Sequence, residues 1–454
     1  NTQTYRTHNH LSLSGDLTIT SGTLTTNNGS SDQNLTVTGY TEIGPASGSA
    51  DQATLNCNAS TVSLGASHTS TYALIVNQGG TFTGGSGTHT IGSFDVKNNS
   101  NAKLTLTSGT TNMSSEKTSD NKAMQISTNA TFSHGNGTVN HTLNANTQYK
   151  SDTSQVALNN FIQNNNSNLQ VNPALTCAGT FTLTAGEFDT SGSSYALTVT
   201  GDASVTATTL LDLLATGNLY NLTINHASCV ARIVSHSTID NDVTVTAGTL
   251  NTAYDVNVTV TGDVSVSGTF GLAEESGAHS FGSLKIANGG TYTATSGTTT
   301  LTNKNSSNYM LEDLGTFTHN NGTVHFKADT SSGTWYAVKG HSTEDTTEFY
   351  NVTTERVGSS IGNYRVCVGG SNQFFTVRNN LTVAANCKIF SSNGSSILRH
   401  SGLAIIDGEL DLDSFTDIEM GAVTINSGGT LEFDNGSITI KAESLRNVGG
   451  TINA

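Results

Sequence analysis

Three carboxylates alternate with leucines in one short run of the sequence. Glu409, Asp411 and Asp413 are separated by Leu410 and Leu412. This spacing predicts a strand that points both leucines inward and all three carboxylates to one outer face. Like charges on one face repel one another unless water or a cation such as Ca²⁺ lies between them. The run therefore predicts either a calcium site or, as the reading we favour, a solvated face that opposes aggregation.

A second group of residues has the chemistry of a glycan-binding surface. Trp335, Tyr336, Tyr350, Tyr364 and Arg365 fall in one segment, although aromatic residues make up only 6% of the chain. Aromatic rings provide platforms for sugar rings, and a guanidinium donates several hydrogen bonds. The segment is therefore the best candidate for a ligand-binding groove, or for a glycosidase carboxylate pair. A packing layer or a contact between subunits is the alternative, and it is the reading we favour.

Several histidines occupy duplicated positions. His134 and His319 stand at the same place in two similar segments, and His89 matches His279 in another pair. A residue that recurs in every copy of a repeat serves the scaffold more often than it serves chemistry. We expect these side chains to make hydrogen bonds in turns rather than to bind a metal.

The five cysteines are widely spaced and include no CxxC pair. An odd number of cysteines cannot all be paired in disulfides within the chain, and these spacings do not match those of a zinc site. We expect them to be small buried hydrophobic residues.

Composition excludes several classes of function. The formal net charge is −16, and no cluster of Lys and Arg with interleaved aromatics occurs, which argues against nucleic-acid binding. No apolar stretch is long enough for a membrane span, so no membrane insertion is expected. No nucleophile elbow, phosphate loop or metalloprotease motif is present, so the chain is not expected to be an enzyme. No cofactor is expected apart from Ca²⁺ at the acidic run.

The elements that position these residues are predicted from internal repeats. Thr and Val alternate in stretches of four to six residues that end at Gly, Asn or Asp, which is typical of short β-strands. The pairs of similar segments are 89–113 with 279–301, 131–139 with 316–324, and 181–205 with 243–266. Only 209–220 has the pattern of a capping turn or short helix. Repeats of variable length favour a β-solenoid, in which strands stack while the turns change in length.

The predicted fold is all-β, a right-handed parallel β-helix that forms an elongated rod. Coils of roughly 20–25 residues would give about 20 coils. We expect one repeat array at 1–157, a second at 158–348, and a diverged segment with a ligand or assembly surface at 349–454. The alternative is an array of β-sandwich domains, for which the Asn-Gly dipeptide within 430–440 would supply a hairpin.

Three phrases carry a resemblance to a known class of proteins. They are VTVTGDVSVSGTF at 258–270, GGTYTATSGTTTLT at 289–302 and GTFTHNNGTVHF at 315–326. The chain resembles the β-helical repeat regions of tail-fibre and virion-surface proteins of tailed marine phages. It is similar, more weakly, to secreted bacterial adhesin-type repeat proteins. The resemblance implies an elongated part on a virion surface or outside a cell, and it supplies no catalytic residue.

Three functions follow from these observations. The first is a homotrimeric phage tail-fibre or tailspike shaft that presents a surface for a host glycan or receptor. The second is a subunit of an extracellular filament or adhesin of a bacterium or archaeon, which assembles end to end by strand addition through residues 4–20. The third, less favoured, is a glycan-degrading β-helix enzyme.

Overall fold

The computed structural model contains strands joined by turns, and no helix occurs among the residues it describes. Those residues are 3–45, 52–153, 155–172, 174–189, 196–206, 209–213, 218–328, 335–340, 347–357, 364–369, 373–391, 396–413, 415–433 and 440–453. A membrane-spanning helix is therefore not found in this part of the chain.

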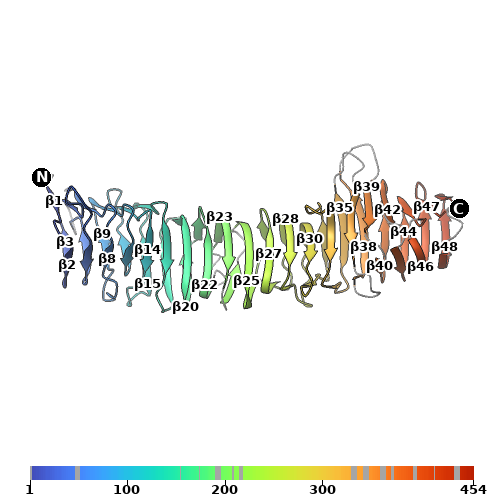
Figure 1. Ribbon diagram of the computed structural model, residues 1–454, viewed down its shortest axis with the longest axis horizontal. Coiled ribbons are helices and arrows are strands. Elements are labelled where there is room, and N and C mark those ends of the chain that lie inside the picture. Colours follow the sequence, from blue (N-terminus) through green and yellow to red (C-terminus); the bar gives the residue numbers. More distant parts are fainter. Residues whose placement is uncertain are drawn as a thin grey trace. The chain divides into compact units, whose positions relative to one another are not determined.

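The chain divides into two compact units, each a parallel β-solenoid (Figure 1). The first comprises Asn1–Tyr220 and Ser228–Ala231, and the second Asn221–Ala227 and Arg232–Ala454.

Each coil of the first unit contributes strands to three faces, and each strand pairs in parallel with the strand one coil away. The first face begins with β2 (Leu11–Leu13), β5 (Leu35–Val37), β8 (Val62–Leu64) and β11 (His89–Ile91). The second begins with β3 (Leu17–Ile19), β6 (Thr41–Ile43), β9 (Leu74–Val76) and β12 (Phe94–Val96). The third consists of β1 (Thr4–Arg6), β4 (Gly22–Thr25), β7 (Ala53–Asn56), β10 (Gly80–Thr83), β13 (Lys103–Thr105) and β16 (Thr131–Ser133). Later strands such as β20 (Asn160–Asn172) and β22 (Phe181–Asp189) are longer and continue over two faces.

The second unit repeats this arrangement. Its strands that bear on the candidate sites are β27 (Val243–Thr252), β29 (Thr269–Phe270), β30 (His279–Ile286), β31 (Thr291–Thr293), β33 (Tyr309–Asp313), β34 (Thr316–Thr318), β35 (Thr323–Ala328), β36 (Trp335–Lys339), β37 (Glu348–Phe349), β38 (Asn351–Arg356), β39 (Tyr364–Val368), β40 (Phe374–Val377), β41 (Leu381–Val383), β42 (Cys387–Ser391), β43 (Ser396–His400), β45 (Glu409–Asp411), β46 (Phe415–Asn426), β47 (Thr430–Glu432), β48 (Ile440–Val448) and β49 (Thr451–Asn453).

The predicted parallel solenoid is confirmed, and the sandwich alternative is wrong. In the described part of the chain, antiparallel contacts are isolated bridges, such as the one between Asn27 and Asp32. The Asn-Gly dipeptide proposed for a hairpin, at 435–436, lies outside the described residues.

The coils are longer and fewer than expected. Stacked residues are 20 positions apart for Asn221 and Asn241 but 28 apart for Asn112 and Asn140. The solenoid has about 17 turns, where the sequence predicted about 20. The difference lies in the turns, because a turn can lengthen while the strands on either side keep their register.

Residues 209–220 do not form the expected capping turn or short helix. Thr209–Leu213 is strand β24, which pairs in parallel with β22. A short apolar run is compatible with a helix or with a buried strand, and here pairing with the neighbouring coil decides for the strand.

The duplicated histidines fall into two groups. The ring Nδ1 of His134 accepts a hydrogen bond from the backbone N–H of Asn136 at 2.9 Å, and His319 does the same for Asn321 at 3.0 Å. Both asparagines have a positive φ, so the imidazole stabilises a left-handed turn residue. Turn bonding is confirmed for this pair.

The other duplicated pair lies in the core instead. His89 and His279 are buried, and burial lowers the pKa of each imidazole to about 4. His279 Nδ1 lies 3.2 Å from the hydroxyl of Tyr292, which lies 3.1 Å from the hydroxyl of Thr299. The two imidazoles are therefore neutral core groups at ordinary pH, and the expectation of turn bonding is wrong for them.

Four cysteines are buried and free, as expected: Cys57, Cys177, Cys229 and Cys387. Burial raises the pKa of each of these thiols, so they remain protonated and unreactive. The side chain of Cys367 lies outside the described part of the chain.

Aromatic rings stack from coil to coil inside the second unit. The ring centroids of Tyr292 and Phe317 are 5.8 Å apart, those of Phe317 and Phe349 are 5.5 Å apart, and those of Phe349 and Phe375 are 5.5 Å apart. Such pairs contribute about 0.5–1.5 kcal/mol each beyond the area they bury. The stack therefore fixes the register of successive coils as well as filling the core.

Replacing the central ring should destabilise the second unit strongly. We expect Phe349→Ala to lower the free energy of unfolding by about 3–5 kcal/mol, because it leaves a cavity between two stacked rings. Denaturant unfolding would measure this. Tyr254→Ala is the matched control, since that ring is 70% exposed, and a change there beyond about 0.5 kcal/mol would contradict the assignment.

Candidate functional site

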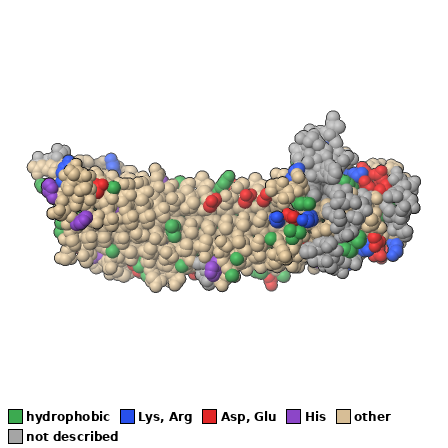
Figure 2. Space-filling model, viewed as in Figure 1, with side chains coloured by type: hydrophobic (Ala, Val, Ile, Leu, Met, Phe, Trp, Pro, Cys, Tyr) green, Lys and Arg blue, Asp and Glu red, His purple; other side chains and the backbone are tan. Residues whose placement is uncertain are grey.

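Amide and hydroxyl side chains on the outer faces form ladders between coils. Asn140 donates to Asn112 at 3.0 Å in the first unit. In the second unit Asn379 donates to Asn351 at 2.9 Å. Each donated amide N–H thus pairs with an amide oxygen one coil away, and this surface carries little charge. Figure 2 shows one such face, on which most side chains are neither charged nor hydrophobic.

A lysine lies among three carboxylates on the second unit. The Lys388 ammonium is 2.6 Å from Glu409, 2.8 Å from Asp411 and 3.5 Å from Glu432. Lys388 is on β42, the first two acids are on β45, and Glu432 is on β47. The register aligns Lys388 with Glu409, and Asp411 with Glu432. Three successive coils therefore supply one cluster.

The three carboxylates, hereafter the acidic cluster (Glu409, Asp411 and Glu432), have oxygens within 4.8 Å of one another. The sequence placed Glu409 and Asp411 together correctly, and β45 ends at Asp411. Among the described residues the group of carboxylates close enough to share a metal ion contains Glu432, not Asp413. Sequence reasoning missed Glu432 because it belongs to the next coil.

Lys388 partly neutralises the acidic cluster. Burial lowers the pKa of Lys388, but the hydrogen bonds with Asp411 and Glu409 outweigh burial, so the pKa is raised overall. The pKa of the Glu432 carboxyl is also raised, first by its contact with Glu409 and then by burial. One ammonium faces three acids, so the cluster has capacity for further positive charge. Glu409 also lines a cavity of about 320 Å³ with Asn386 and Thr430. Calcium binding by Glu409, Asp411 and Asp413 stays a prediction.

The aromatic segment is divided between strand series. Trp335 and Tyr336 lie on β36, and Tyr364 and Arg365 lie on β39, but the side chains of these four lie outside the described part of the chain. The backbone register pairs Trp335 with Arg365.

The same register pairs Arg365 with Lys388. The two sites predicted from the sequence therefore share one register column, which runs from Trp335 through Arg365 and Lys388 to Glu409.

Tyr350 belongs to a different part of the coil, in the turn between β37 and β38. Its ring stacks on His319 of the preceding coil, with centroids 5.5 Å apart and an interplanar angle of 29°. Glu348 and Arg378 form an ion pair nearby, with Arg378 Nε 3.0 Å from a Glu348 oxygen. Burial lowers the pKa of His319, and the charge of Glu348 opposes this. Tyr350 is therefore packed against the scaffold rather than placed in the column of Trp335.

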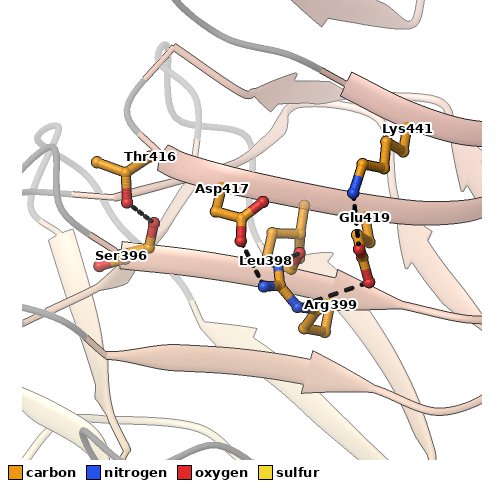
Figure 3. A network of polar contacts seen from close by, with 7 residues as sticks. All are labelled: Ser396, Leu398, Arg399, Thr416, Asp417, Glu419 and Lys441. Carbon is orange, nitrogen blue, oxygen red and sulfur yellow. Dashed lines mark hydrogen bonds and ion pairs between the residues drawn. The ribbon is translucent and has the colours of Figure 1, made fainter.

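A second network of charges alternates along the last coils (Figure 3). Arg399 on β43 lies 2.5 Å from Asp417 and 3.8 Å from Glu419, both on β46. Lys441 on β48 lies 3.4 Å from Glu419. Glu419 and Lys441 also line a groove of about 390 Å³. Opposite charges thus follow one another at stacked positions, which stabilises neighbouring coils modestly.

Comparison of the chain with protein-family models, with curated proteins and with solved structures gave no match.

Removing the lysine should turn the acidic cluster into a calcium-dependent element. We expect Lys388→Met to destabilise the second unit by about 1–3 kcal/mol, because partly buried carboxylates lose their counter-charge. Added CaCl₂ should restore much of that loss in thermal unfolding, and it should act less on the unsubstituted protein.

Lys441→Met provides the matched control for this variant. That ammonium is exposed and, in the described part of the chain, forms an ion pair with Glu419 alone. Its loss should change stability by less than about 0.5 kcal/mol, with no response to calcium. A Lys388→Met protein indifferent to calcium would contradict the predicted affinity of these carboxylates for the ion.

Proposed function

We infer that the chain is a non-enzymatic structural protein of a phage virion, a tail-fibre or tailspike shaft that presents a host-binding surface. The observation that carries this proposal is the register within each unit. Val352, for example, pairs in parallel with Val324 on one side and Leu381 on the other. Hydrogen bonds and core contacts join every coil to the next, and this suits a spacer that must resist extension.

The outer surface supports the same proposal. Its Thr, Ser and Asn ladders remain hydrated without depending on charge, which suits a protein on a virion surface or outside a cell. The resemblance of residues 258–326 to phage tail-fibre repeats points in the same direction. A tail-fibre shaft of this kind forms a homotrimer, so we propose that three copies associate side by side.

The column of Trp335, Arg365 and Lys388 is the best candidate for the host-binding surface. An aromatic residue and an arginine follow one another on successive coils, and the next position is Lys388, whose ammonium is paired with the acidic cluster. Aromatic rings and guanidinium groups are suited to sugars that carry hydroxyl or acidic groups. We therefore propose a bacterial surface glycan as the ligand class.

A self-assembling filament or adhesin subunit is the second candidate. Such a subunit would assemble end to end by strand addition, for which residues 4–20 are the donor segment that the sequence predicts.

Particle size and mass discriminate the two candidates. For a shaft we expect electron microscopy and mass determination in solution to give discrete rods of three chain masses, at concentrations from low to high. Long filaments with a regular axial repeat would instead favour the second candidate. A monomer at every concentration would contradict both modes of assembly.

Glycan binding by the register column can be tested separately. We expect Trp335→Ala with Arg365→Ala to weaken binding of the labelled protein to a panel of bacterial surface polysaccharides at least tenfold, as loss of an anchor and a charge predicts. Tyr254→Ala, which removes an exposed ring elsewhere, should leave binding unchanged. Equal binding by both variants, with the same particle mass, would exclude the column as the surface.

A further inference from the structure

A carboxyl group is buried in the second unit without a cationic partner. Glu275, in the turn between β29 and β30, is 1% exposed. Two other buried acids have lysine partners: Asp95 pairs with Lys97, and Glu312 pairs with two lysines. Among the described residues no Lys, Arg or His lies within ion-pair distance of Glu275. A buried carboxylate without a counter-charge is costly and calls for an explanation.

Glu275 connects the coil before it with the coil after it. One carboxyl oxygen, Oε1, accepts the backbone N–H of Thr252 at 2.6 Å. The carbonyl oxygen of Glu275 accepts the backbone N–H of Ser296 at 2.9 Å. Asn320, one coil further, donates to the carbonyl of Ala273 in the same turn at 2.8 Å. The carboxyl group therefore lies at a corner where successive coils meet.

The polar atoms left over at this corner are oxygens that can accept. Glu275 Oε2 is buried without a hydrogen-bond partner, as are the hydroxyls of Thr252 and Thr295 and the amide oxygen of Asn251. All four side chains are more than nine-tenths buried. The backbone N–H of Thr252 donates to the Glu275 carboxyl group. Thr295 precedes Ser296, whose backbone N–H donates to the carbonyl oxygen of Glu275. The unpartnered oxygens thus occur on three successive coils at one corner.

A glycine packs closely against this corner. Gly271 has φ +92°, and a Cβ there would lie 3.5 Å from Glu275 Oε2 and 2.1 Å from the carbonyl oxygen of Thr293. A side chain at this position would therefore meet Thr293 and approach the carboxyl group. The donor set is carboxylate, hydroxyl, amide and carbonyl oxygen, which is the set that hard cations prefer.

We propose that the corner formed by Thr252, Glu275 and Thr295 binds a hard cation, Ca²⁺ or Na⁺, which joins three coils of the second unit. The cation supplies the positive charge that lysines supply to Asp95 and Glu312. This site is separate from the acidic cluster and from the proposed glycan surface, and its role is to stabilise the coil.

A proton is the competitor of the cation. Burial raises the pKa of Glu275 to about 7, and the neighbouring charge of Glu274 adds to this, while the hydrogen bond from the backbone N–H of Thr252 opposes it. Burial raises the pKa of the Tyr292 phenol, and the charge of Glu275 adds to this. The neutral His279 contacts Tyr292. Protonated Glu275 is compatible with the fold below pH 7. As the pH rises through 7 the unpaired charge destabilises the fold, unless a cation binds.

The test is thermal unfolding of the full chain at pH 5.5 and pH 8, after a chelator has removed any bound metal. Equal ionic strengths of CaCl₂, NaCl and choline chloride distinguish Ca²⁺, Na⁺ and screening alone. We expect CaCl₂ or NaCl to raise the melting temperature of the second unit by several degrees over choline at pH 8, and by much less at pH 5.5. A melting temperature at pH 8 that is the same in all three salts overturns the proposal.

Variants separate this corner from the other carboxylates. Glu275→Gln should abolish the salt-specific rise, whereas Glu274→Gln in the same turn, whose side chain is exposed, should retain it. If Glu275→Gln does not fold, Thr295→Val keeps the shape of the side chain and should weaken the apparent cation affinity several-fold. A rise that persists in Glu275→Gln or is unchanged in Thr295→Val assigns the cation elsewhere and overturns the proposal.

Discussion

The parallel register between successive coils is the constraint on which the rest of each unit depends. Apart from a few bulges, strand residues in the described part of the chain pair with residues one coil away, and alternate residues point inward and outward. A slip of one position would bring all inward side chains of a strand to the surface. Leu284, for example, is in register with Val264 and Leu311, and all three are buried. Turns can lengthen freely only because they lie outside this register.

The constraint makes every feature repeat along a column. Tyr292 is in register with Phe317, and their rings meet; Phe349 meets Phe317 from a position two residues beyond Thr347, the register partner of Phe317. Asparagines at outward positions, such as Asn140 and Asn379, donate to a side chain one coil away. A charged side chain can lie beside an opposite charge on the next coil, as Glu312 lies beside Lys285 and Lys339. Where no opposite charge is in register, the problem is an unpaired charge, whose cost must be offset in another way.

The two groups of acids illustrate different solutions to that problem. At the acidic cluster a lysine from the preceding coil is inserted among the carboxylates. At the corner of Glu275 the neighbouring coils supply hydroxyl and amide oxygens, which cannot neutralise a charge. The first arrangement carries its own counter-charge, and the second depends on what the solution provides. Both occur on a surface or core that is otherwise mainly uncharged, so each stands out electrostatically.

The sequence by itself determined the strands, the solenoid and the roles of residues that act locally. Alternation of Thr and Val, the internal repeats, and histidines two residues before a turn asparagine are short-range patterns, and the turn bonds of His134 and His319 confirm them. Glu409 and Asp411 share a face because a strand alternates, which also follows from sequence. Tertiary structure alone decided that Lys388, 21 positions earlier, lies beside them. It also decided that residues 209–213 form a strand, and that Trp335, Arg365 and Lys388 share a column. The physical reason is that coil length varies, from 20 to 28 residues in the ladders above. A neighbour in the column therefore stands at no fixed distance in the sequence, and only the register identifies it.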